Sequence, residues 1–330
     1  MKIVQFKSFG KGHEVANVVE VDDPGAPGDG EVLVDVEAFP INPVDLLTIA
    51  GTYASRPELP AIPGSEGLGK VVKIGPGVTQ VKPGDRVLLM GRENWMQRKR
   101  VKAGEILPIH VDADPLQLSM LKINPATALL MLKRYRDLAA GDWLIQNAAN
   151  SGVGSILISL AKADGVRTVN VVRREELVAP LLSLGADVVL IDGPDLAARV
   201  REATEAADIA LGVDAVAGNA TGRMAECLAE GGVVVNYGLL SGKPCAIDPH
   251  QVIFRQIDLT GFWLVKHLGA MSNDERVALY SDLGRRIAGK ALEVKIAAVY
   301  EIDDIKMALE HAAREARGGK VLVTPNGPLS

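Results

Sequence analysis

The chain has 330 residues, 48% of them hydrophobic and 23% charged, which is typical of a folded globular protein and excludes a largely disordered one. Its net charge of −5 argues against nucleic acid as the main partner. The two cysteines, Cys227 and Cys245, are too few for a disulfide framework or a cysteine-rich zinc site. No apolar run approaches the ~20 residues that span a membrane, and no signal or transit peptide precedes the first strand-like segment. We therefore expect a cytoplasmic protein without a membrane partner.

The first 118 residues are predicted to be all-β. Strand-like runs at 2–6, 15–21 and 31–38 are separated by Gly/Pro clusters, and residues 81–87 have the pattern of a turn followed by a strand. We assign residues 1–118 to a first domain.

From about residue 120 the pattern changes to alternating strands and helices. Apolar, β-rich runs are predicted as strands at 142–147, 167–172, 186–191, 208–213, 231–237 and 257–263. The helices between them are predicted at 152–164, 175–184, 195–206 and 218–229. This alternation predicts an α/β fold with a doubly wound parallel (Rossmann) sheet over residues 119–268. The apolar runs 186–191 and 233–235 are expected to be strands buried on both faces.

Residues 269–330 are predicted to return to the first domain and complete it. The expected elements are a helix at 272–288, a strand at 294–300, a helix at 302–314 and a short strand at 320–323.

A candidate phosphate-binding turn follows the first strand of the Rossmann segment. Residues 147–154, Asn-Ala-Ala-Asn-Ser-Gly-Val-Gly, stand where a dinucleotide-binding protein carries G-x-G-x-x-G. Gly152 and Gly154 lie at the start of the next helix, while Asn147, Asn150 and Ser151 can donate to phosphate or cap that helix. The turn alone is equally compatible with an ordinary strand–helix connection.

The end of the next strand favours NADPH as the cofactor. About 20 residues after such a turn, an NAD site carries a carboxylate that accepts hydrogen bonds from the ribose. Here the strand ends in Arg173-Arg174 instead. A guanidinium pair binds a 2′-phosphate through charge-assisted hydrogen bonds, whereas an acid would repel it.

No metal is predicted. The five histidines (13, 110, 250, 267 and 311) are scattered, and none has a neighbour at metal-ligand spacing. Without a Lewis acid, alcohol oxidation lacks its usual agent. Reduction of an activated C=C bond remains feasible, because hydrogen-bond donors can stabilise the enolate that forms.

The segment Gly64-Ser65-Glu66-x-x-Gly69-x5-Gly75-x-x-Val78 resembles the signature of the medium-chain dehydrogenase/reductase superfamily. Ser65 stands where its zinc alcohol dehydrogenases carry a histidine ligand, and Asn42–Asp45 where they place a cysteine. The resemblance implies a zinc-independent member with a mostly-β, GroES-like catalytic domain beside the Rossmann domain.

A narrower resemblance covers residues 41 to 320 and points to the mitochondrial-type 2-enoyl thioester reductases. The motifs that carry it, in chain order, are Ile41-Asn42-Pro43-x-Asp45, Gly51-Thr52-Tyr53, Asn124-Pro125-Ala126-Thr127-Ala128, the 145–154 loop, Asn170–Arg173, Tyr237-Gly238, Gly261-Phe262-Trp263 and Gly319-Lys320.

The resemblance implies roles for individual residues. By match, Tyr53 serves as the proton donor or carbonyl anchor, and a phenol is chemically suited to donate to an enolate. Trp263 would face the acyl pocket together with Tyr53. The residues implied to bind the cofactor are Asn42, Asn124, Asn150, Ser151, Gly152, Val153, Arg173, Arg174, Tyr237, Gly238, Leu239, Leu240, Phe262, Trp263, Leu264 and Lys320. As alternatives, Tyr53 is a half-buried loop aromatic and Trp263 a core side chain on the last strand.

Two segments depart from the pattern of this family. Glu175-Glu176 places acids beside the expected 2′-phosphate site, which weakens the preference expected for NADPH. The run from Arg92 to Lys102 is unusually basic. It could attract coenzyme A phosphates or an acidic acyl carrier protein, or it could be a charged edge strand that resists aggregation, which is the more frequent case.

The leading hypothesis is therefore NADPH-dependent reduction of trans-2-enoyl thioesters. An alternative enzyme function is a quinone or small enone reductase with a shorter pocket. An alternative of another class is a non-catalytic role, either crystallin-like or nucleic-acid-binding, which the acidic net charge disfavours. The strand at 257–263 would be the sixth of a doubly wound sheet and hence an edge, so we expect a homodimer joined edge to edge.

Overall fold

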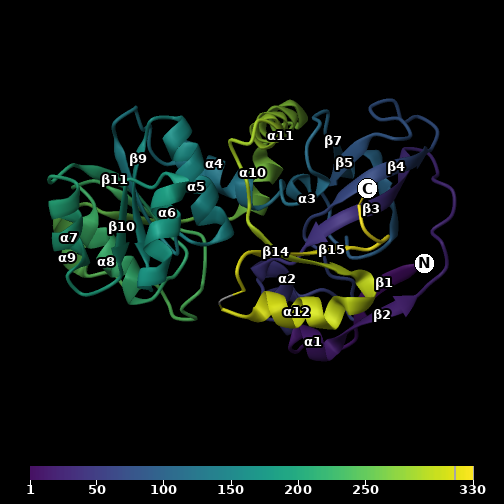
Figure 1. Ribbon diagram of the computed structural model, residues 1–330, viewed down its shortest axis with the longest axis horizontal. Helices are drawn as coiled ribbons and strands as arrows, with labels where there is room; N and C mark the ends of the chain where they lie inside the picture. Colours follow the sequence, from purple (N-terminus) through teal and green to yellow (C-terminus); the bar gives the residue numbers. More distant parts are fainter. Residues whose placement is uncertain (316, 330) are drawn as a thin grey trace. The chain divides into compact units, whose positions relative to one another are not determined.

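The computed structural model describes residues 1–315 and 317–329, and its chain divides into two compact units. The first unit comprises Met1–Ile123 and Asn273–Ser330, and the second comprises Asn124–Ser272. Figure 1 shows both units, with labels on those helices and strands for which there is room.

The first unit is built around a seven-stranded sheet with the order β14-β15-β3-β4-β5-β7, in which β6 also pairs with β3. These strands are β3 (Glu31–Pro40), β4 (Leu68–Ile74), β5 (Arg86–Leu89), β6 (Arg98–Lys102), β7 (Ile106–Pro108), β14 (Ile296–Glu301) and β15 (Lys320–Thr324). A separate antiparallel pair is formed by β1 (Lys2–Phe6) and β2 (Ala16–Glu20).

Strand β3 is the centre of this unit because it pairs with β4, β6 and β15. Its residues Val32, Val34 and Val36 alternate along the strand and are fully buried, as expected when one face of a strand packs on a core. The same hydrophobic cluster includes Phe39 and Trp95, whose rings stack with centroids 5.3 Å apart.

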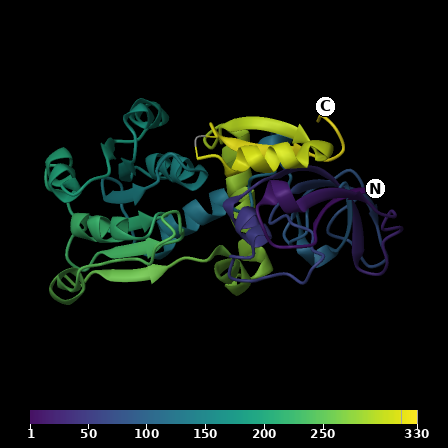
Figure 2. The same cartoon turned by 90° about the horizontal axis from the view of Figure 1, so that it is seen from below.

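The C-terminal segment completes the sheet that the N-terminal segment begins. Strand β15 lies antiparallel to β3, with Leu322 opposite Pro40 and Val323 opposite Phe39. Helix α12 (Ile305–Ala313) packs against α1 (Gly12–Val15), and Figures 1 and 2 both show the yellow α12 beside the purple α1. Lys320, at the start of β15, is thereby placed next to residues that are far away in the sequence.

The prediction that residues 1–118 are all-β is wrong at several places. Besides α1, this region contains α2 (Pro43–Ala50), the short 3-10 helix η1 (Ala103–Glu105) and α3 (Pro115–Leu118). Helix α2 begins after Asn42 with proline at its first position, and the Asp45 carboxylate accepts a hydrogen bond from the backbone N–H of Asn42 at 2.8 Å. Asn-Pro-x-Asp is a helix-start pattern, so the sequence does contain the signal for this helix.

Beyond residue 270 the predicted helices are present with small changes of boundary. Helix α11 runs over Asn273–Ala288, and the helix expected at 302–314 consists of the 3-10 helix η3 (Ile302–Asp304) followed by α12.

The second unit contains a six-stranded, entirely parallel sheet with the order β10-β9-β8-β11-β12-β13. This is the doubly wound order, and it confirms the predicted α/β fold class. The strands are β8 (Trp143–Asn147), β9 (Arg167–Val172), β10 (Val188–Ile191), β11 (Ile209–Asp214), β12 (Val233–Asn236) and β13 (Asp258–Gly261).

The helices of the second unit connect these strands. They are α4 (Asn124–Arg134), α5 (Gly152–Ala163), η2 (Glu175–Leu177) with α6 (Val178–Leu184), α7 (Leu196–Ala203), α8 (Asn219–Cys227), α9 (Pro249–Phe254) and α10 (Leu264–Ala270). Helices α4, α9 and α10 were not expected from the sequence, since each is short or lies in a segment without clear apolar periodicity.

The expectation that residues 186–191 form a strand buried on both faces is wrong. Strand β10 is an edge of the sheet, and all four of its residues are only partly buried. The same expectation holds for Val233–Val235, which lie in β12 and are buried. Apolar composition marks a strand but does not distinguish an edge from the interior of the sheet.

Candidate functional site

The turn between β8 and α5 presents a helix N-terminus. Ser151 is the N-cap of α5, and its Oγ accepts a hydrogen bond from the backbone N–H of Gly154 at 3.1 Å. A Cβ on Gly154 would lie 2.6 Å from the carbonyl oxygen of Ala149, so this close approach of helix and strand requires glycine. The first N–H groups of a helix lack intrahelical acceptors, and Gly152 and Val153 can offer theirs to an anion.

Asn147 has a different role from the phosphate donor considered above. It is buried, its Nδ2 donates to Asp214 Oδ1 at 2.6 Å, and its Oδ1 accepts from the backbone N–H of Ala215 at 2.8 Å. Asp214, at the end of β11, also accepts hydrogen bonds from the backbone N–H groups of Val216 and Ala217, from Thr221 Oγ1 and from Asn236 Nδ2. This network joins the carboxyl ends of β8, β11 and β12, where doubly wound sheets bind their ligands.

The two arginines expected to bind a 2′-phosphate lie just after β9. Arg173 is exposed, and Arg174 is partly buried. The Nε of Arg174 lies 2.8 Å from Glu176 Oε1, with the two side chains 40% and 67% exposed. The acid that departs from the family pattern therefore contacts one of the two arginines, and a 2′-phosphate would compete with it.

The segment after β12 contributes one buried hydroxyl and two exposed leucines. Tyr237 is held by a hydrogen bond from its backbone N–H to the carbonyl of Asp214 at 2.9 Å. Its hydroxyl oxygen is buried next to Ser151, and burial raises the pKa of Tyr237 to about 12. Leu239 and Leu240, by contrast, are 67% and 64% exposed. The segment after β12 therefore presents exposed apolar side chains at the carboxyl end of the sheet, where doubly wound folds bind their ligands.

The two aromatic residues that follow β13 differ in their exposure to solvent. Phe262 is buried and stacks on the ring of His267, with centroids 4.4 Å apart, while Trp263 is 40% exposed. Trp263 precedes Leu264, the first residue of α10. An exposed fraction this large does not fit the alternative of a core tryptophan. Of the other predicted cofactor residues of this unit, Asn124 is buried at the start of α4, Asn150 is exposed and Gly238 is partly buried.

In the first unit, the structure brings together Asn42 and Lys320, which are 278 residues apart in the sequence. Lys320 Nζ donates to Asn42 Oδ1, and Asn42 Nδ2 donates to Glu66 Oε1 at 2.7 Å. Glu66 also accepts from the backbone N–H of Ile123 at 2.9 Å. Burial lowers the pKa of Lys320 to about 8, against the attraction of Glu66. Glu66 and Lys122, which lie in this cluster, were not predicted as site residues.

Tyr53 lies on the loop that follows α2. Gly51 ends the helix with φ of 73°, which favours glycine, and the chain turns so that the backbone N–H of Tyr53 donates to the carbonyl of Leu47 at 3.2 Å. The Tyr53 ring is partly exposed, and the guanidinium of Arg92 lies 5.3 Å from its centroid. The phenol of Tyr53 therefore lies on a loop that a backbone hydrogen bond fixes to α2, and the cation of Arg92 lies next to its ring.

The basic run from Arg92 to Lys102 contains two arginines that pair with acidic neighbours. Arg98 pairs with Asp35 and Asp23, at 2.6 and 2.9 Å, and Arg100 lies 3.3 Å from Glu31. The residues of β6 fit the charged-strand alternative better than a docking surface for acidic partners.

The positions that zinc relatives use do not suit a metal ion here. Asn42 is fully engaged by its partners, and the ammonium of Lys122 donates to the carbonyl of Ser65 at 2.5 Å, which would repel a cation. Among residues 1–315 and 317–329, no group of three or more His, Cys, Asp or Glu side chains is arranged to hold a metal. In the same part of the chain, none of the helices combines the length and apolar character needed to cross a bilayer.

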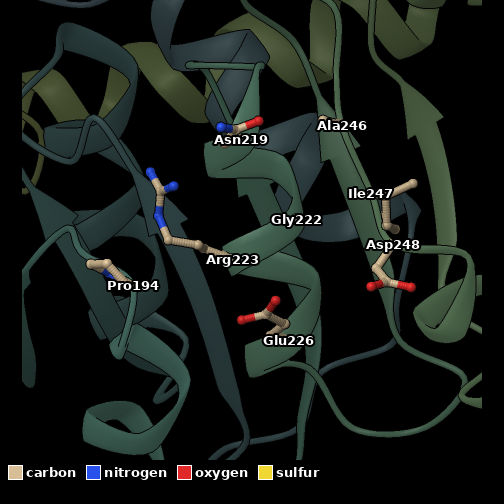
Figure 3. A pocket seen from close by; sticks show the side chains of 8 residues that line it. All are labelled: Pro194, Asn219, Gly222, Arg223, Glu226, Ala246, Ile247 and Asp248. Carbon is tan, nitrogen blue, oxygen red and sulfur yellow. The ribbon is translucent and has the colours of Figure 1, made fainter.

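An open pocket of about 480 Å³ lies along α8, away from the predicted site residues. Figure 3 shows α8 between Pro194 on one side and the segment Ala246–Asp248 on the other. The charge of Arg223 in this pocket is paired with Asp192 at 2.5 Å. None of the residues predicted to bind cofactor or substrate lines it, so we do not assign this pocket to the site.

Two family models match the chain. Residues 28–106 match the alcohol dehydrogenase GroES-like domain, and residues 152–282 match the zinc-binding dehydrogenase family.

Curated relatives match most of the chain. The mitochondrial enoyl-acyl-carrier-protein reductase of Bos taurus is 34% identical over 328 residues, which cover 96% of this chain and 87% of the relative. A Caenorhabditis elegans protein of the same name is 37% identical over 265 residues, covering 78% of this chain and 76% of the relative.

Solved structures show the same fold along the whole chain. A Bacillus thuringiensis protein proposed to be an NADPH:quinone reductase superposes with a TM-score of 0.90 and 30% identity, covering 98% of both chains. The mitochondrial 2-enoyl thioester reductase heterodimer of Candida tropicalis superposes with a TM-score of 0.88 and 24% identity, covering 98% of this chain and 99% of the other. The latter identity is low enough that it supports the fold alone.

Proposed function

Because the chain belongs to the medium-chain dehydrogenase/reductase superfamily, among the mitochondrial-type enoyl-acyl-carrier-protein reductases, we propose that it reduces the C=C bond of trans-2-enoyl thioesters with NADPH. NADPH-dependent oxidoreductase chemistry on C=C bonds follows from the family, and the thioester substrate is the finer inference. The observation that carries it is the 34% identity to the bovine reductase over 96% of this chain.

The residues of the second unit suit a nicotinamide dinucleotide. The N-terminus of α5 offers backbone donors for the pyrophosphate. Arg173 and Arg174 would bind the 2′-phosphate. In the first unit, Lys320 is a buried cation, and the family resemblance implies that it binds the cofactor. When bound, NADPH supplies the hydride.

Tyr53 is assigned the proton transfer. As the β-carbon receives the hydride, negative charge moves to the thioester oxygen, and the α-carbon then needs a proton. The phenol of Tyr53 donates it, or anchors the oxygen that carries the charge. The guanidinium of Arg92, 5.3 Å from the centroid of the Tyr53 ring, helps to hold that ring in place.

Isotope placement tests the proposed reduction of the C=C bond. With NADPH deuterated at C4 of the nicotinamide and crotonyl thioester as substrate, mass spectrometry of the butyryl product should find one deuterium, on the β-carbon. With unlabelled NADPH in D2O, the deuterium should be on the α-carbon. The absence of a saturated thioester product would reject the proposed function.

Glu176 is expected to limit the preference for NADPH over NADH. Replacing it in Glu176→Gln frees Arg174 for the 2′-phosphate, so the ratio of NADPH to NADH affinity should rise about threefold, as for an exposed ion pair. The control is Glu175→Gln, which removes the same charge one residue earlier. Fluorescence titration with both cofactors gives the affinity ratio for each variant. An equal rise in both variants would show that the preference depends on the total negative charge near the site and not on the ion pair between Glu176 and Arg174.

A quinone or small enone reductase is the second candidate, favoured by the Bacillus thuringiensis structure at 30% identity. Such an enzyme would bind NADPH at the same site and would differ in having a shorter substrate pocket. A non-catalytic crystallin-like or nucleic-acid-binding role has no support from the relatives, which carry the names of enzymes. The cytoplasmic location stays a prediction, since these relatives are named as mitochondrial proteins.

The substrate carrier is part of the proposal. The relatives' names point to an acyl carrier protein, yet the two arginines of β6, Arg98 and Arg100, are engaged in ion pairs. We therefore expect coenzyme A thioesters to suffice as substrates, with an acyl carrier protein not required.

We further propose a homodimer formed by β13. All four residues of this edge strand are exposed, and so are neighbouring apolar side chains, including Phe254 at 68% and Leu259 at 40%. Asp258 and Phe262 direct their N–H groups to β12, so the N–H of Leu259 points outward and can pair with a second copy.

Light scattering at micromolar concentration should therefore give the mass of a dimer. Leu259→Pro removes the outward N–H without breaking the bonds to β12, and it should yield a monomer. Leu259→Ala keeps this N–H and should remain dimeric, although its dimer should be weaker. A monomeric parent protein would contradict the proposal.

A further inference from the structure

Four ionisable side chains are buried together in the first unit. Asp45, Glu66, Lys122 and Lys320 are 2%, 0%, 8% and 4% exposed, respectively. Two carry negative and two positive charge, so the cluster is neutral when all four are ionised. Buried charges are costly unless they are compensated in this way.

Hydrogen bonds connect Glu66 to Lys320 through one amide. Asn42 Nδ2 donates to Glu66 Oε1, and Asn42 Oδ1 accepts from Lys320 Nζ. The backbone N–H of Asn42 is in turn fixed by Asp45, whose other carboxylate oxygen accepts from the backbone N–H of Ser65 at 2.8 Å. The Asn42 amide therefore links the two groups, and the negative charge of Glu66 stabilises the ammonium of Lys320.

Lys122 is the member of the cluster that the proposed function leaves without a role. Its ammonium donates to the carbonyls of Ser65 and Gly91, at 2.5 and 2.9 Å, and its own carbonyl accepts from the hydroxyl of Tyr280 at 3.0 Å. A neutral donor would satisfy both of these carbonyls. The positive charge therefore requires another explanation, which the neighbouring carboxylates provide.

The charges around the cluster act in opposite directions. Burial lowers the pKa of Lys122 to about 8; Glu66 and Asp45 raise it, whereas Lys99 and Arg92 lower it. For Lys320, burial again lowers the pKa to about 8, Glu66 and Asp45 raise it, and Arg317 lowers it.

Glu66 depends on both lysines to remain a carboxylate. Burial raises the pKa of Glu66, and Lys320, the donors Asn42 and Ile123, and Lys122 lower it. Loss of the Lys122 charge would leave the cluster with one excess negative charge in a buried place. Such a site restores neutrality by taking up a proton, which here converts Glu66 to the neutral acid.

We propose that Lys122 is a positioning residue that keeps Glu66 ionised and thereby keeps Lys320 charged for the binding of NADPH. The inference rests on the proposed function only in placing Lys320 at the cofactor. Lys122 itself acts through Glu66 and Asn42 rather than by touching the cofactor.

The test is the pH dependence of NADPH binding, measured by fluorescence titration from about pH 6 to about pH 9 without substrate. In the parent protein, affinity should fall as the pH rises through about 8, where Lys320 and Lys122 lose their protons. In Lys122→Met this fall should begin about one pH unit lower, because Glu66 no longer supports the ammonium of Lys320. At pH 8 the dissociation constant should then be about fivefold higher than that of the parent protein.

A double-mutant cycle distinguishes this role from a structural one. Glu66→Gln should shift the midpoint downward as Lys122→Met does, and the double variant should shift it no further, since residue 66 is neutral in all three. Lys99→Met is the matched control: Lys99 is also a partly buried ammonium, bonded to the carbonyl of Arg92, and it should leave the midpoint near that of the parent.

An unchanged midpoint in Lys122→Met, or shifts that add in the double variant, would overturn the proposal. If Lys122→Met does not fold, Lys122→Gln, which keeps a donor for the two carbonyls, and the charge-conserving Lys122→Arg provide the same comparison. Gln should shift the midpoint and Arg should not. Because no substrate is present, a protein that binds NADPH but does not reduce enoyl thioesters still tests the role of Lys122.

Discussion

Tyr53→Phe is expected to lower the turnover of enoyl thioesters by about 10²- to 10⁴-fold, the range for a positioned proton donor. The substitution keeps the ring, and with it the contact to Arg92, and deletes only the hydroxyl. NADPH affinity should change little, since the nucleotide is bound chiefly by residues of the second unit. Steady-state kinetics and a fluorescence titration of NADPH measure the two quantities.

Tyr300→Phe is a matched control for this result. It also removes one hydroxyl from the first unit, where Tyr300 pairs with Nδ1 of His311 at 3.0 Å. Its turnover should stay close to that of the parent protein. A Tyr53→Phe variant with turnover within a few-fold of the parent would show that water or another group supplies the proton, and Tyr53 would then be a packing residue.

Replacing both Arg173 and Arg174 by alanine is expected to remove most of the preference for NADPH. The parent protein should bind NADPH at least about tenfold more tightly than NADH, because charge-assisted hydrogen bonds reach the 2′-phosphate. In the double variant NADPH should bind about as weakly as NADH, while NADH affinity should be nearly unchanged. Calorimetric or fluorescence titrations with both cofactors give these ratios.

Arg167→Ala serves as the control, since Arg167 lies at the opposite end of β9 and packs over the ring of Trp143. This variant should retain the preference of the parent protein. Equal binding of NADPH and NADH by the unmodified protein would contradict the assignment of the two arginines, whatever the variants do.

The Rossmann part of the fold could be predicted because its evidence is local. Each strand is a short apolar run, the crossover helices α5 to α8 have their own periodicity, and the turn at Ser151–Gly154 lies between a strand and a helix. The edge position of β10 could not be predicted in the same way, because its apolar residues resemble those of a central strand.

The secondary structure of the first unit was harder to predict, because its short helices lie between segments with a clear β-strand pattern. Helix α2 has only eight residues, but Asn42, Pro43 and Asp45 form a start signal that a search for helix caps would detect. Helices α1 and α3, with four residues each, are too short to show any periodicity.

The buried charge network lies beyond the reach of sequence patterns. Asn42 and Lys320 are separated by 278 residues, and Asn147 and Asp214 by 67. Asn42 and Lys320 were implied by motifs one by one, yet only the pairing of β15 with β3 joins them. Lys122 belongs to no motif, and the role that we propose for it rests on its burial beside Glu66.

The central claim, reduction of 2-enoyl thioesters, is tested most directly by comparing kcat/KM for crotonyl thioester with kcat/KM for a simple quinone, both followed through NADPH oxidation. We expect crotonyl thioester to be the better substrate by at least about tenfold, because binding along the acyl thioester is used to stabilise the transition state. Faster NADPH oxidation with the quinone, and no measurable reduction of the thioester, would contradict the account.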